Sequence, residues 1–523
     1  MRGRFAFSLG LATVLVGSFA VPASAAPPSI TLSPTSGQPS TSVAVTGSGF
    51  GAGETVNLSF DAKKVAAATT TSTGSFSKTI KVPKKASSGV HTVKASGATS
   101  GLTATATFTV GGGGGGGGTN WPHFRFDDDH TGVQPLETLL GVSNVPMLQL
   151  KWQAQLGKLV DFSSPAVVNG VAYIGSSDGR LWAWPANGCG QDICVQPLWK
   201  STSFAQILDS PTVVNGLVYV GSQTSTNSND GKLDVFSASG CGNPVCAPLW
   251  QGLAGPESIL ESSPTVAGGF VYIGSFDGKM YVFSAAGCGA ATCQPLWTGA
   301  TGDHIESTPT VNGTTVYIGS NDGKLYAFPA AGCGAATCQP VWTGQTGETI
   351  FDSTPAVSSG TVYIGSVHHI SAFPAAGCGA ATCQPLWQGS NGSDFVDGSP
   401  AVFGGRVYTP LEDSIGVFNA SGCGQAQCSP MWIDFGTGTQ AAILSSPTIA
   451  NGVVYAGKNN GDVLAWKAAP CGQSVCTQIW SYTTHDPIVS SSPTVVNGTV
   501  YIGGSNNLAP ESTAGRLYVF ALP

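Results

Sequence analysis

The chain has 523 residues, of which only 9% are charged, while 72 are Gly and 33 are Pro. This composition suits tightly turned β-structure better than helices, and 41% apolar residues in periodic runs exclude a wholly disordered chain. A net charge of −7 without basic clusters argues against binding to nucleic acid or to anionic membranes.

Residues 1–25 have the pattern of a secretory signal peptide. Arg2 and Arg4 precede a mostly apolar stretch at 5–19, and Ala23-Ser24-Ala25 is an A-x-A cleavage site. No other apolar run is long enough to span a bilayer, so no membrane insertion is expected. We expect a secreted or cell-surface-associated protein.

Residues 26–110 read as a separate β module. Runs such as SVAVTG, ETVNLSF and TATATFTV alternate apolar with small or polar residues, as strands with one buried face do. The segment SPTSGQPSTSVAVTGSGFGAGETVNLSF resembles the start of the immunoglobulin-like modules of the IPT/TIG type, which implies a β-sandwich. The polyglycine run at 111–118 then predicts a flexible linker.

Residues 119–523 repeat one unit: S/T-P, a short apolar run, an N-G turn, V-Y-I-G-S, D-G-K-L-Y-A-F, two cysteines and P-L-W. A period of about 45 residues, made of short β-type runs, predicts a β-propeller. The Trp of the unit stands at Trp199, Trp250, Trp297, Trp342, Trp387, Trp432 and Trp480. The Pro stands at Pro165, Pro211, Pro264, Pro309, Pro355, Pro400, Pro447 and Pro493.

Each unit fits a blade of four strands. Inner strand A follows S/T-P, strand B is V-Y-I-G-S, strand C is K-L-Y-A-F, and outer strand D is the P-L-W stretch. The eighth unit stops at 518–521, which is strand C, and therefore has no strand D of its own. Upstream of the first unit, LQLKWQAQLG places Trp152 in strand-D register. We predict eight blades, closed by this N-terminal outer strand, because closure removes open sheet edges.

The cysteines form seven C-x-x-x-x-C pairs, one in each of seven units. Local bridging is the simplest pairing in an exported chain, and each bridge would contribute roughly 2 kcal/mol by closing a short loop. Structural zinc would need four ligands, whereas successive pairs lie on different blades. The predicted disulfides are Cys189–Cys194, Cys241–Cys246, Cys288–Cys293, Cys333–Cys338, Cys378–Cys383, Cys423–Cys428 and Cys471–Cys476.

From residue 120 onward the chain resembles the propellers of the pyrroloquinoline-quinone (PQQ) repeat family. The repeat core TVYIGSNDGKLYAFPAAG matches the family pattern, and the lead-in NWPHFRFDDDHTG resembles the opening of quinoprotein dehydrogenases. The resemblance implies PQQ held between a Trp and a disulfide of adjacent cysteines, beside Ca²⁺ and a catalytic Asp. This sequence has no adjacent cysteines, and the cysteine hairpin replaces the D-x-x-T-G part of the family's docking pattern.

The D–A and B–C loops lie on one face of such a propeller and vary along the chain. Six acidic residues there precede the S/T-P motif. Carboxylates that ring a channel mouth would bind a cation or acquire raised pKa values; alternatively, each accepts local hydrogen bonds that turn the chain into strand A. The six are Asp161, Asp209, Glu261, Glu306, Asp352 and Asp397.

Four histidines fall on the same face: His304 and His485 in D–A loops, and His368 and His369 in the fifth B–C loop. Imidazoles beside carboxylates suit a transition metal, but no H-x-H or H-E-x-x-H spacing supports a ligand set, so no metal ligand is assigned. The Asp127-Asp128-Asp129-His130 cluster in the lead-in is expected to cap the propeller.

These observations predict a monomeric, non-catalytic exported propeller that engages an extracellular protein or polysaccharide through this face. No catalytic residue and no cofactor is assigned. The alternative is a quinoprotein-type oxidoreductase with an atypical site for PQQ and Ca²⁺. A fold shared with enzymes is an analogy, not proof of catalysis.

Overall fold

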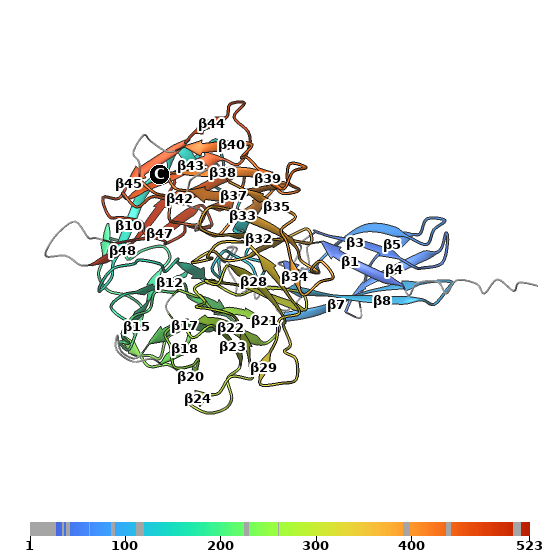
Figure 1. Cartoon of the computed structure of the whole chain (residues 1–523), viewed down its shortest axis with the longest axis horizontal. Coiled ribbons are helices and arrows are strands. Elements are labelled where there is room, and N and C mark those ends of the chain that lie inside the picture. Colours follow the sequence, from blue (N-terminus) through green and yellow to red (C-terminus); the bar gives the residue numbers. More distant parts are fainter. Residues whose placement is uncertain are drawn as a thin grey trace, which may run out of the picture. The chain divides into compact units, whose positions relative to one another are not determined.

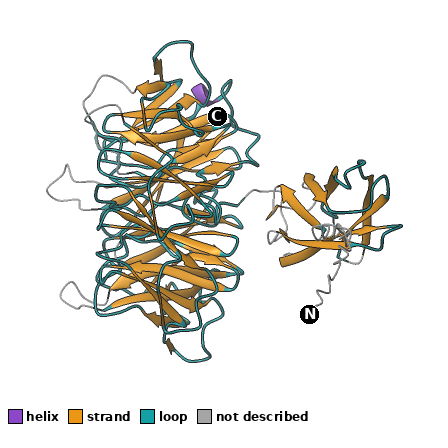
Figure 2. Ribbon diagram, turned by 45° about the vertical axis from the view of Figure 1, so that its right-hand side comes forward, coloured by secondary structure: helices purple, strands orange, loops and turns teal. Residues whose placement is uncertain are grey.

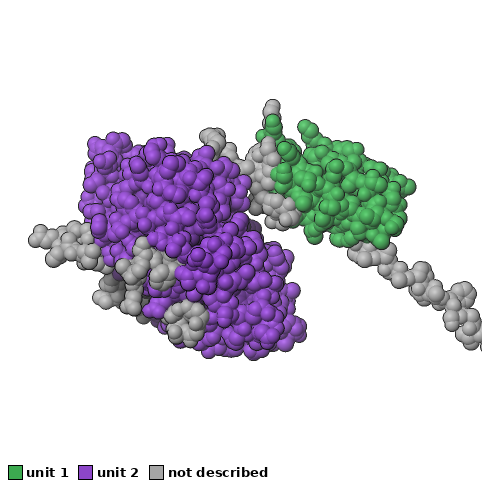
Figure 3. Space-filling view, turned by 90° about the horizontal axis from the view of Figure 1, so that it is seen from above, with its two compact units in different colours: residues 1–116 green, residues 117–523 purple. Residues whose placement is uncertain are grey.

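The structure is a computed structural model of the chain, which divides into two compact units, residues 1–116 and 117–523 (Figure 3). The predicted signal peptide, at 1–25, and the polyglycine run, at 111–118, lie outside the described residues. The structure describes residues 28–33, 36–37, 42–61, 63–84, 89–110, 120–223, 230–259, 261–390, 398–435, 441–505 and 514–523.

Strands make up nearly all of the regular structure (Figure 2). Among the described residues, the one helical element is the short 3-10 helix η1 (Val145–Met147). No helix in the described part of the chain is long and apolar enough to cross a membrane. The all-β prediction is confirmed.

The first unit has two sheets around one apolar core. Along β3 and β4 every second side chain is buried, as the alternating sequence predicts, and Val43, Val45, Leu58 and Phe108 belong to the core between the sheets. One sheet has the order β1 (Ser29–Ser33), β3 (Ser42–Ser48), β6 (Phe76–Lys81). The other has the order β2 (Ser36–Gly37), β8 (Thr103–Val110), β7 (Gly89–Gly97), β4 (Thr55–Phe60), β5 (Lys63–Thr69).

The described residues of the second unit form eight five-stranded sheets, whose first strands begin directly after the S/T-P motif. These innermost strands are β11 (Ala166–Val168), β16 (Thr212–Val214), β21 (Thr265–Ala267), β26 (Thr310–Asn312), β31 (Ala356–Ser358), β36 (Ala401–Phe403), β41 (Thr448–Ala450) and β46 (Thr494–Val496). The second strands are β12 (Val171–Ser176), β17 (Leu217–Gln223), β22 (Phe270–Ser275), β27 (Thr315–Ser320), β32 (Thr361–Gly365), β37 (Arg406–Leu411), β42 (Val453–Gly457) and β47 (Thr499–Ser505).

The third and fourth strands complete each sheet outward. The third strands are β13 (Arg180–Pro185), β18 (Gly231–Ser237), β23 (Lys279–Ser284), β28 (Lys324–Pro329), β33 (Ile370–Pro374), β38 (Ser414–Asn419), β43 (Asp462–Lys467) and β48 (Gly515–Ala521). The fourth strands, which contain the repeated Trp, are β15 (Trp199–Ser201), β20 (Trp250–Leu253), β25 (Trp297–Ala300), β30 (Trp342–Gln345), β35 (Trp387–Gly389), β40 (Trp432–Phe435), β45 (Trp480–Thr483) and β10 (Gln149–Gln155).

The strand β10 is the outer neighbour of β48, although the two are far apart in sequence (Figure 1). They pair antiparallel from Gln149 opposite Ala521 to Gln155 opposite Arg516. In Figure 1, cyan β10 lies among the red C-terminal strands, and Trp152 is buried in a core shared with Leu517 and Val519. The N-terminal segment thus completes the last sheet.

The Ser or Thr before each repeated Pro links its sheet to the next one. Its backbone N–H donates to the side-chain hydroxyl of the equivalent residue one sheet further on, at 2.8–3.3 Å. The eight bonds return to their starting point, and we call them the Ser/Thr-Pro ring. The successive residues are Ser164, Ser210, Ser263, Thr308, Thr354, Ser399, Ser446 and Ser492.

The residue two before each Pro supports the second strand of its own sheet. In six sheets a Ser hydroxyl accepts a hydrogen bond from a Gly N–H, as Ser163 does from Gly175 at 2.8 Å. The sixth sheet has Gly398 instead and, opposite it, Pro410, so acceptor and donor are both missing. In the second sheet Asp209 takes the acceptor role, 2.6 Å from Gly221 N.

The residue after each Pro forms a second set of links between sheets. In five sheets it is a Thr whose hydroxyl donates to the carbonyl of the next sheet's Pro, at 2.5–2.6 Å. Ala166, Ala356 and Ala401 lack this hydroxyl, and a replacement is found for the last two. The guanidinium of Arg125 donates to the two carbonyls concerned, those of Pro400 at 2.6 Å and Pro447 at 2.8 Å.

Arg125 belongs to the lead-in segment 120–134, which follows the innermost strands around the unit. In six sheets the N–H two residues after the Pro donates to a lead-in carbonyl, as Val213 does to Pro122 and Val311 to Asp128. In the other two sheets the contact comes from side chains, His130 to Thr265 and Gln134 to the Val495 carbonyl. The lead-in includes β9 (Val133–Gln134), which pairs with β41.

All fourteen cysteines form the seven predicted disulfides. The second Cys of each pair lies in a short strand that pairs, in parallel, with the outer strand of the preceding sheet. The hairpin therefore joins neighbouring sheets as well as closing its own loop. These strands are β14 (Ile193–Cys194), β19 (Val245–Cys246), β24 (Thr292–Cys293), β29 (Thr337–Cys338), β34 (Thr382–Cys383), β39 (Gln427–Cys428) and β44 (Val475–Thr477).

The repeated Trp explains the Gly that precedes most of these cysteines. A Cβ added to Gly188 would lie 2.8 Å from the Trp152 ring, and the same holds for Gly240 over Trp199 at 2.7 Å. No hairpin strand among the described residues pairs with the outer strand β45. The indole N–H of Trp480 in that strand instead donates to the Leu148 carbonyl, just after η1, at 3.1 Å.

The substitution Arg125→Met should lower the free energy of unfolding by about 3 kcal/mol, because it leaves two buried carbonyls without donors. Adding Ala356→Thr and Ala401→Thr supplies the hydroxyls that five other sheets use, and should recover a large part of that loss. Chemical denaturation of the three proteins measures both effects. A triple variant no more stable than Arg125→Met would contradict the assignment.

The substitution Asp209→Ser should stabilise the fold at high pH. Burial, and then the charge of Asp234, raise the pKa of Asp209 well above its usual range. The folded state thus holds this proton more tightly than the unfolded chain, so its stability falls as pH rises above about 4. Ser keeps the bond to Gly221, so we expect a gain of about 1 kcal/mol at pH 8 and none at pH 4 in thermal melts.

Candidate functional site

The loops before the innermost strands meet the turns between the second and third strands at one end of the sheets. The hydroxyl of Ser505 donates to Asp161 at 3.0 Å, and the side-chain amide of Asn321 donates to Glu306 at 3.2 Å. The first bond joins such a loop to the end of β47, and the second joins such a loop to the turn between β27 and β28. We call this end the loop face.

Three carboxylates from successive sheets converge on the loop face: Glu261, Glu306 and Asp352. Each stands three residues before the Pro of its unit, and one oxygen of each lies within 4.8 Å of the others. All three side chains are half-buried. Because the three loops have the same length from carboxylate to Pro, the repeat itself brings the acids together.

Electrostatics within this carboxylate triad favours a proton or a cation. Burial raises the pKa of Asp352 well above its ordinary value, and the charge of Glu261, a hydrogen bond with it and the charge of Glu306 raise it further. Burial also raises the pKa of Glu306, against the effects of Asn321 and His304. Carboxylates this close either share protons or bind a positively charged group.

Two of the other three predicted acids, Asp161 and Asp209, have surroundings separate from the triad. Asp161, four residues before its Pro, accepts from Ser505, and Asp209, two residues before its Pro, accepts from Gly221. Asp209 therefore has the local role in turning the chain that we considered as the alternative, whereas Asp161 joins its loop to β47 of another sheet. Asp397 lies outside the described residues. The triad acids stand three residues before their Pro, and the two acids outside the triad differ from this spacing by one residue.

The predicted histidines do not join one ligand set. His304 is exposed and its Nδ1 contacts the Phe276 carbonyl, while His485 is exposed with a φ of 63°. His368 and His369 both place Nδ1 3.1 Å from the carboxylate of Glu348. Hydrogen bonding to these histidines lowers the pKa of Glu348 although burial opposes it. We did not predict Glu348, because its partners lie twenty residues away in another loop.

The Asp127–His130 cluster lies along the innermost strands, where Asp128 and Asp129 accept backbone bonds from Val311 and Val357. His130 is 1% exposed. We did not predict the role of Arg125, which is also almost wholly buried. Its signal in the sequence is indirect: three units have Ala where five have Thr, and Arg125 serves the carbonyls that two of these, Ala356 and Ala401, leave.

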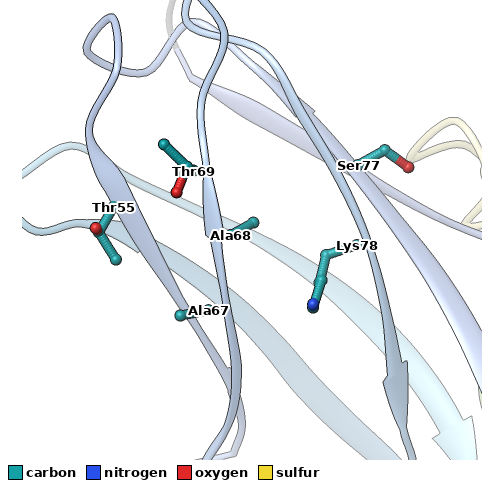
Figure 4. Close-up of a pocket in the computed structure, with 6 residues that line it drawn as sticks. All are labelled: Thr55, Ala67, Ala68, Thr69, Ser77 and Lys78. Carbon is teal, nitrogen blue, oxygen red and sulfur yellow. The ribbon is translucent and has the colours of Figure 1, made fainter.

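A pocket on the first unit is unrelated to these residues. Figure 4 shows its lining by Thr55, Ala67, Ala68, Thr69, Ser77 and Lys78. The lining comes from β4, β5 and β6 and consists of small and polar side chains with one cation. It lacks the apolar and aromatic walls of a typical cofactor site.

The cysteines do not fit the PQQ site that the resemblance implies. That site needs a disulfide between adjacent cysteines, whereas every cysteine here bridges to one five positions away in a hairpin on an outer strand. Trp152 and Trp199 in those outer strands pack beneath the hairpin glycines and are buried. No residue of the triad can be matched to the implied catalytic Asp or Ca²⁺ ligands by motif.

Comparisons with known proteins agree with the architecture. Residues 148–372 match the family described as outer membrane protein assembly factor BamB, and residues 26–110 match the macroglobulin-like domain family. No curated protein matches the sequence. For the first unit, the match thus gives a macroglobulin-like domain where the sequence resembles the IPT/TIG type.

Solved structures are similar to the chain in fold. A europium-containing methanol dehydrogenase, 12% identical, covers 77% of this chain and 98% of its own, with a TM-score of 0.57. A quinohemoprotein alcohol dehydrogenase from Comamonas testosteroni, 13% identical, covers 77% and 80%, with a TM-score of 0.56. BamB from Moraxella catarrhalis, 17% identical, covers 72% and 97%, with a TM-score of 0.50.

These identities are too low to transfer an activity, but the three solved structures are similar to the chain in fold. The second unit is a β-propeller of the PQQ-repeat type found in BamB and the quinoproteins, and the first is a macroglobulin-like, immunoglobulin-type domain.

Proposed function

We propose that this protein is an exported, non-catalytic binding scaffold that captures an extracellular protein through the loop face of its propeller. The scaffold is an eight-bladed ring that β10 closes, and the carboxylate triad is the centre of its binding surface. The macroglobulin-like domain serves as a spacer or second binding unit on the polyglycine linker, where two linked modules gain avidity for a surface-bound target.

The convergence of Glu261, Glu306 and Asp352 is the observation that supports this proposal. Glu306 and Asp352 form no ion pair with a described Lys or Arg, so their charge is available to a partner's basic side chain. Such a partner group would replace the shared proton that the raised pKa values indicate.

The opposite end of the sheets is a poorer candidate for recognition. Its cysteine hairpins already pair with neighbouring outer strands. In addition, seven tyrosines of the second strands donate hydrogen bonds to the neighbouring sheet, each to the carbonyl of the Ala that follows the third strand. Three hairpins have the same sequence, GCGAATCQP. These contacts give the hairpins a role in stability, and their repetition offers a partner little to distinguish.

Export is part of the proposal and rests on two observations. The first 25 residues have the pattern of a signal peptide, and seven disulfides suit an oxidising environment. In the cytoplasm the hairpins would be reduced. The exported form is expected to be monomeric.

The alternative, an oxidoreductase with an atypical PQQ site, predicts a different outcome in one experiment. The purified full chain is titrated with PQQ in the presence of Ca²⁺, while absorbance and dye-coupled oxidation of alcohols and sugars are followed. We expect no saturable PQQ binding and no turnover, because the vicinal disulfide is missing. Saturable binding with turnover would overturn the non-catalytic proposal.

The triple substitution Glu261→Gln, Glu306→Gln and Asp352→Asn should abolish partner capture without weakening the fold. Amides keep the shape and remove the repulsion, so the unfolding free energy should rise by about 1 kcal/mol at pH 8. This gain should shrink toward pH 4, because carboxyls with raised pKa values destabilise the fold only as pH rises.

Capture is measured by pull-down of surface proteins from the source cells, followed by competition with free wild-type protein. The control variant, Glu257→Gln with Asp303→Asn, removes two charges from the same group of loops outside the triad. It should capture as well as the wild type. Equal capture by the triple variant would show that the triad has no role in binding.

A further inference from the structure

The lead-in segment contains a group of buried polar side chains that the proposed function does not use. His123 is 8% exposed and His130 is 1% exposed. Arg125, Phe126 and His130 have positive φ values of 61°, 82° and 51°. The chain is therefore tightly folded at this point, next to the innermost strands of the propeller.

Two of the three neighbouring aspartates have clear partners. Asp127 accepts from the backbone and the hydroxyl of Thr131, both at 2.9 Å, and Asp129 accepts from the side-chain amide of Asn312 at 2.8 Å. The carboxylate of Asp128 receives no hydrogen bond from a described residue. Its side chain is half-buried, with 47% of its surface exposed, so water can reach the carboxylate.

The Asp128 carboxylate lies near a ring nitrogen of His123 that also lacks a hydrogen bond. Nδ1 of His123 is buried without a hydrogen-bond partner among the described residues, and it lies 3.7 Å from Oδ1 of Asp128. That separation is too long for a hydrogen bond. It is close to the spacing of two ligands on one divalent ion, which is about 3.4 Å for tetrahedral bonds of about 2.1 Å.

The charge balance around this pair favours a cation. Burial raises the pKa of Asp128 to about 7, and the charges of Asp127 and Asp129 contribute. Burial lowers the pKa of His123 to about 4, which leaves its imidazole neutral and able to donate a lone pair at neutral pH. The guanidinium of Arg125 is already engaged with two carbonyls.

We propose that His123 Nδ1 and the Asp128 carboxylate bind a divalent transition-metal ion, such as Zn²⁺, inside the propeller. One imidazole and one carboxylate oxygen suit such an ion, and the open space beside Asp128 admits the waters that complete its coordination. The ion relieves the repulsion among the three aspartates. It also links the lead-in turn at His123 to the turn at Asp128, and so stabilises the segment that contacts all eight sheets.

The test is a titration of chelator-treated full-length protein with Zn²⁺ alone, by calorimetry at pH 7.5. We expect one site per chain, of modest affinity because the protein supplies only two ligands, and a rise in melting temperature on binding. His123→Gln and Asp128→Asn should each weaken binding at least tenfold. Asp128→Asn leaves the backbone carbonyl that accepts from Val311 in place.

The matched control is His304→Gln with Asp303→Asn. This pair also places an imidazole nitrogen 4.0 Å from a carboxylate oxygen, but both side chains are 52% exposed. The control should bind Zn²⁺ as the wild type does. No binding by the wild type, or unchanged binding by both lead-in variants, would overturn the proposal.

A measurement on the wild type alone covers the case in which the variants do not fold. Crystals grown with Zn²⁺ should give an anomalous-scattering peak between His123 and Asp128. A peak only at Glu261, Glu306 and Asp352, or only at His368 and His369, would instead assign the metal to the loop face and refute the site in the lead-in.

Discussion

The ring of hydrogen bonds through the residues before the repeated prolines is the constraint on which the rest of the propeller depends. A residue before Pro is held in an extended conformation, and Pro itself donates no backbone hydrogen bond. The preceding N–H, as in Ser164, therefore pairs with the next sheet rather than its own. Because the last link runs from Ser492 back to Ser164, each sheet is held on both sides.

The departures from this pattern come in compensating pairs. Where Gly398 removes an acceptor, Pro410 removes the matching donor, and where Ala356 and Ala401 remove hydroxyls, Arg125 supplies N–H groups from a distant segment. Buried polar groups in proteins are almost always paired, so a lost partner must be replaced or lost on both sides. Asp209 is one exception, because it keeps the bond to Gly221 but buries a carboxyl whose Oδ1 has no described partner. Ala166 is another, because no hydrogen bond from a described side chain replaces the hydroxyl that it lacks.

The two ends of the propeller have different roles because backbone pairing restricts the hairpins at one end and not the loops at the other. The cysteine hairpins complete outer strands that would otherwise be open edges, and this use restricts their sequence. The loops at the other end complete no outer strand, and in six units the Ser two residues before the Pro already stabilises the turn. Glu261, Glu306 and Asp352 are thus free to converge, and the chain tolerates the repulsion among them.

The sequence alone determined the strands, the disulfides and the register of Trp152. These depend on local periodicity and on spacing, which a repeat displays many times over. It also placed acidic residues on one face, but not which of them meet: Asp161 and Asp209 differ from the triad by a single position. Only the tertiary structure decided that three carboxylates converge, that Arg125 stands in for two threonines, and that His123 faces Asp128. The first two contacts join residues from different sheets or distant segments, and the third depends on the tight backbone turns of the lead-in, so none of the three follows from a periodic sequence pattern.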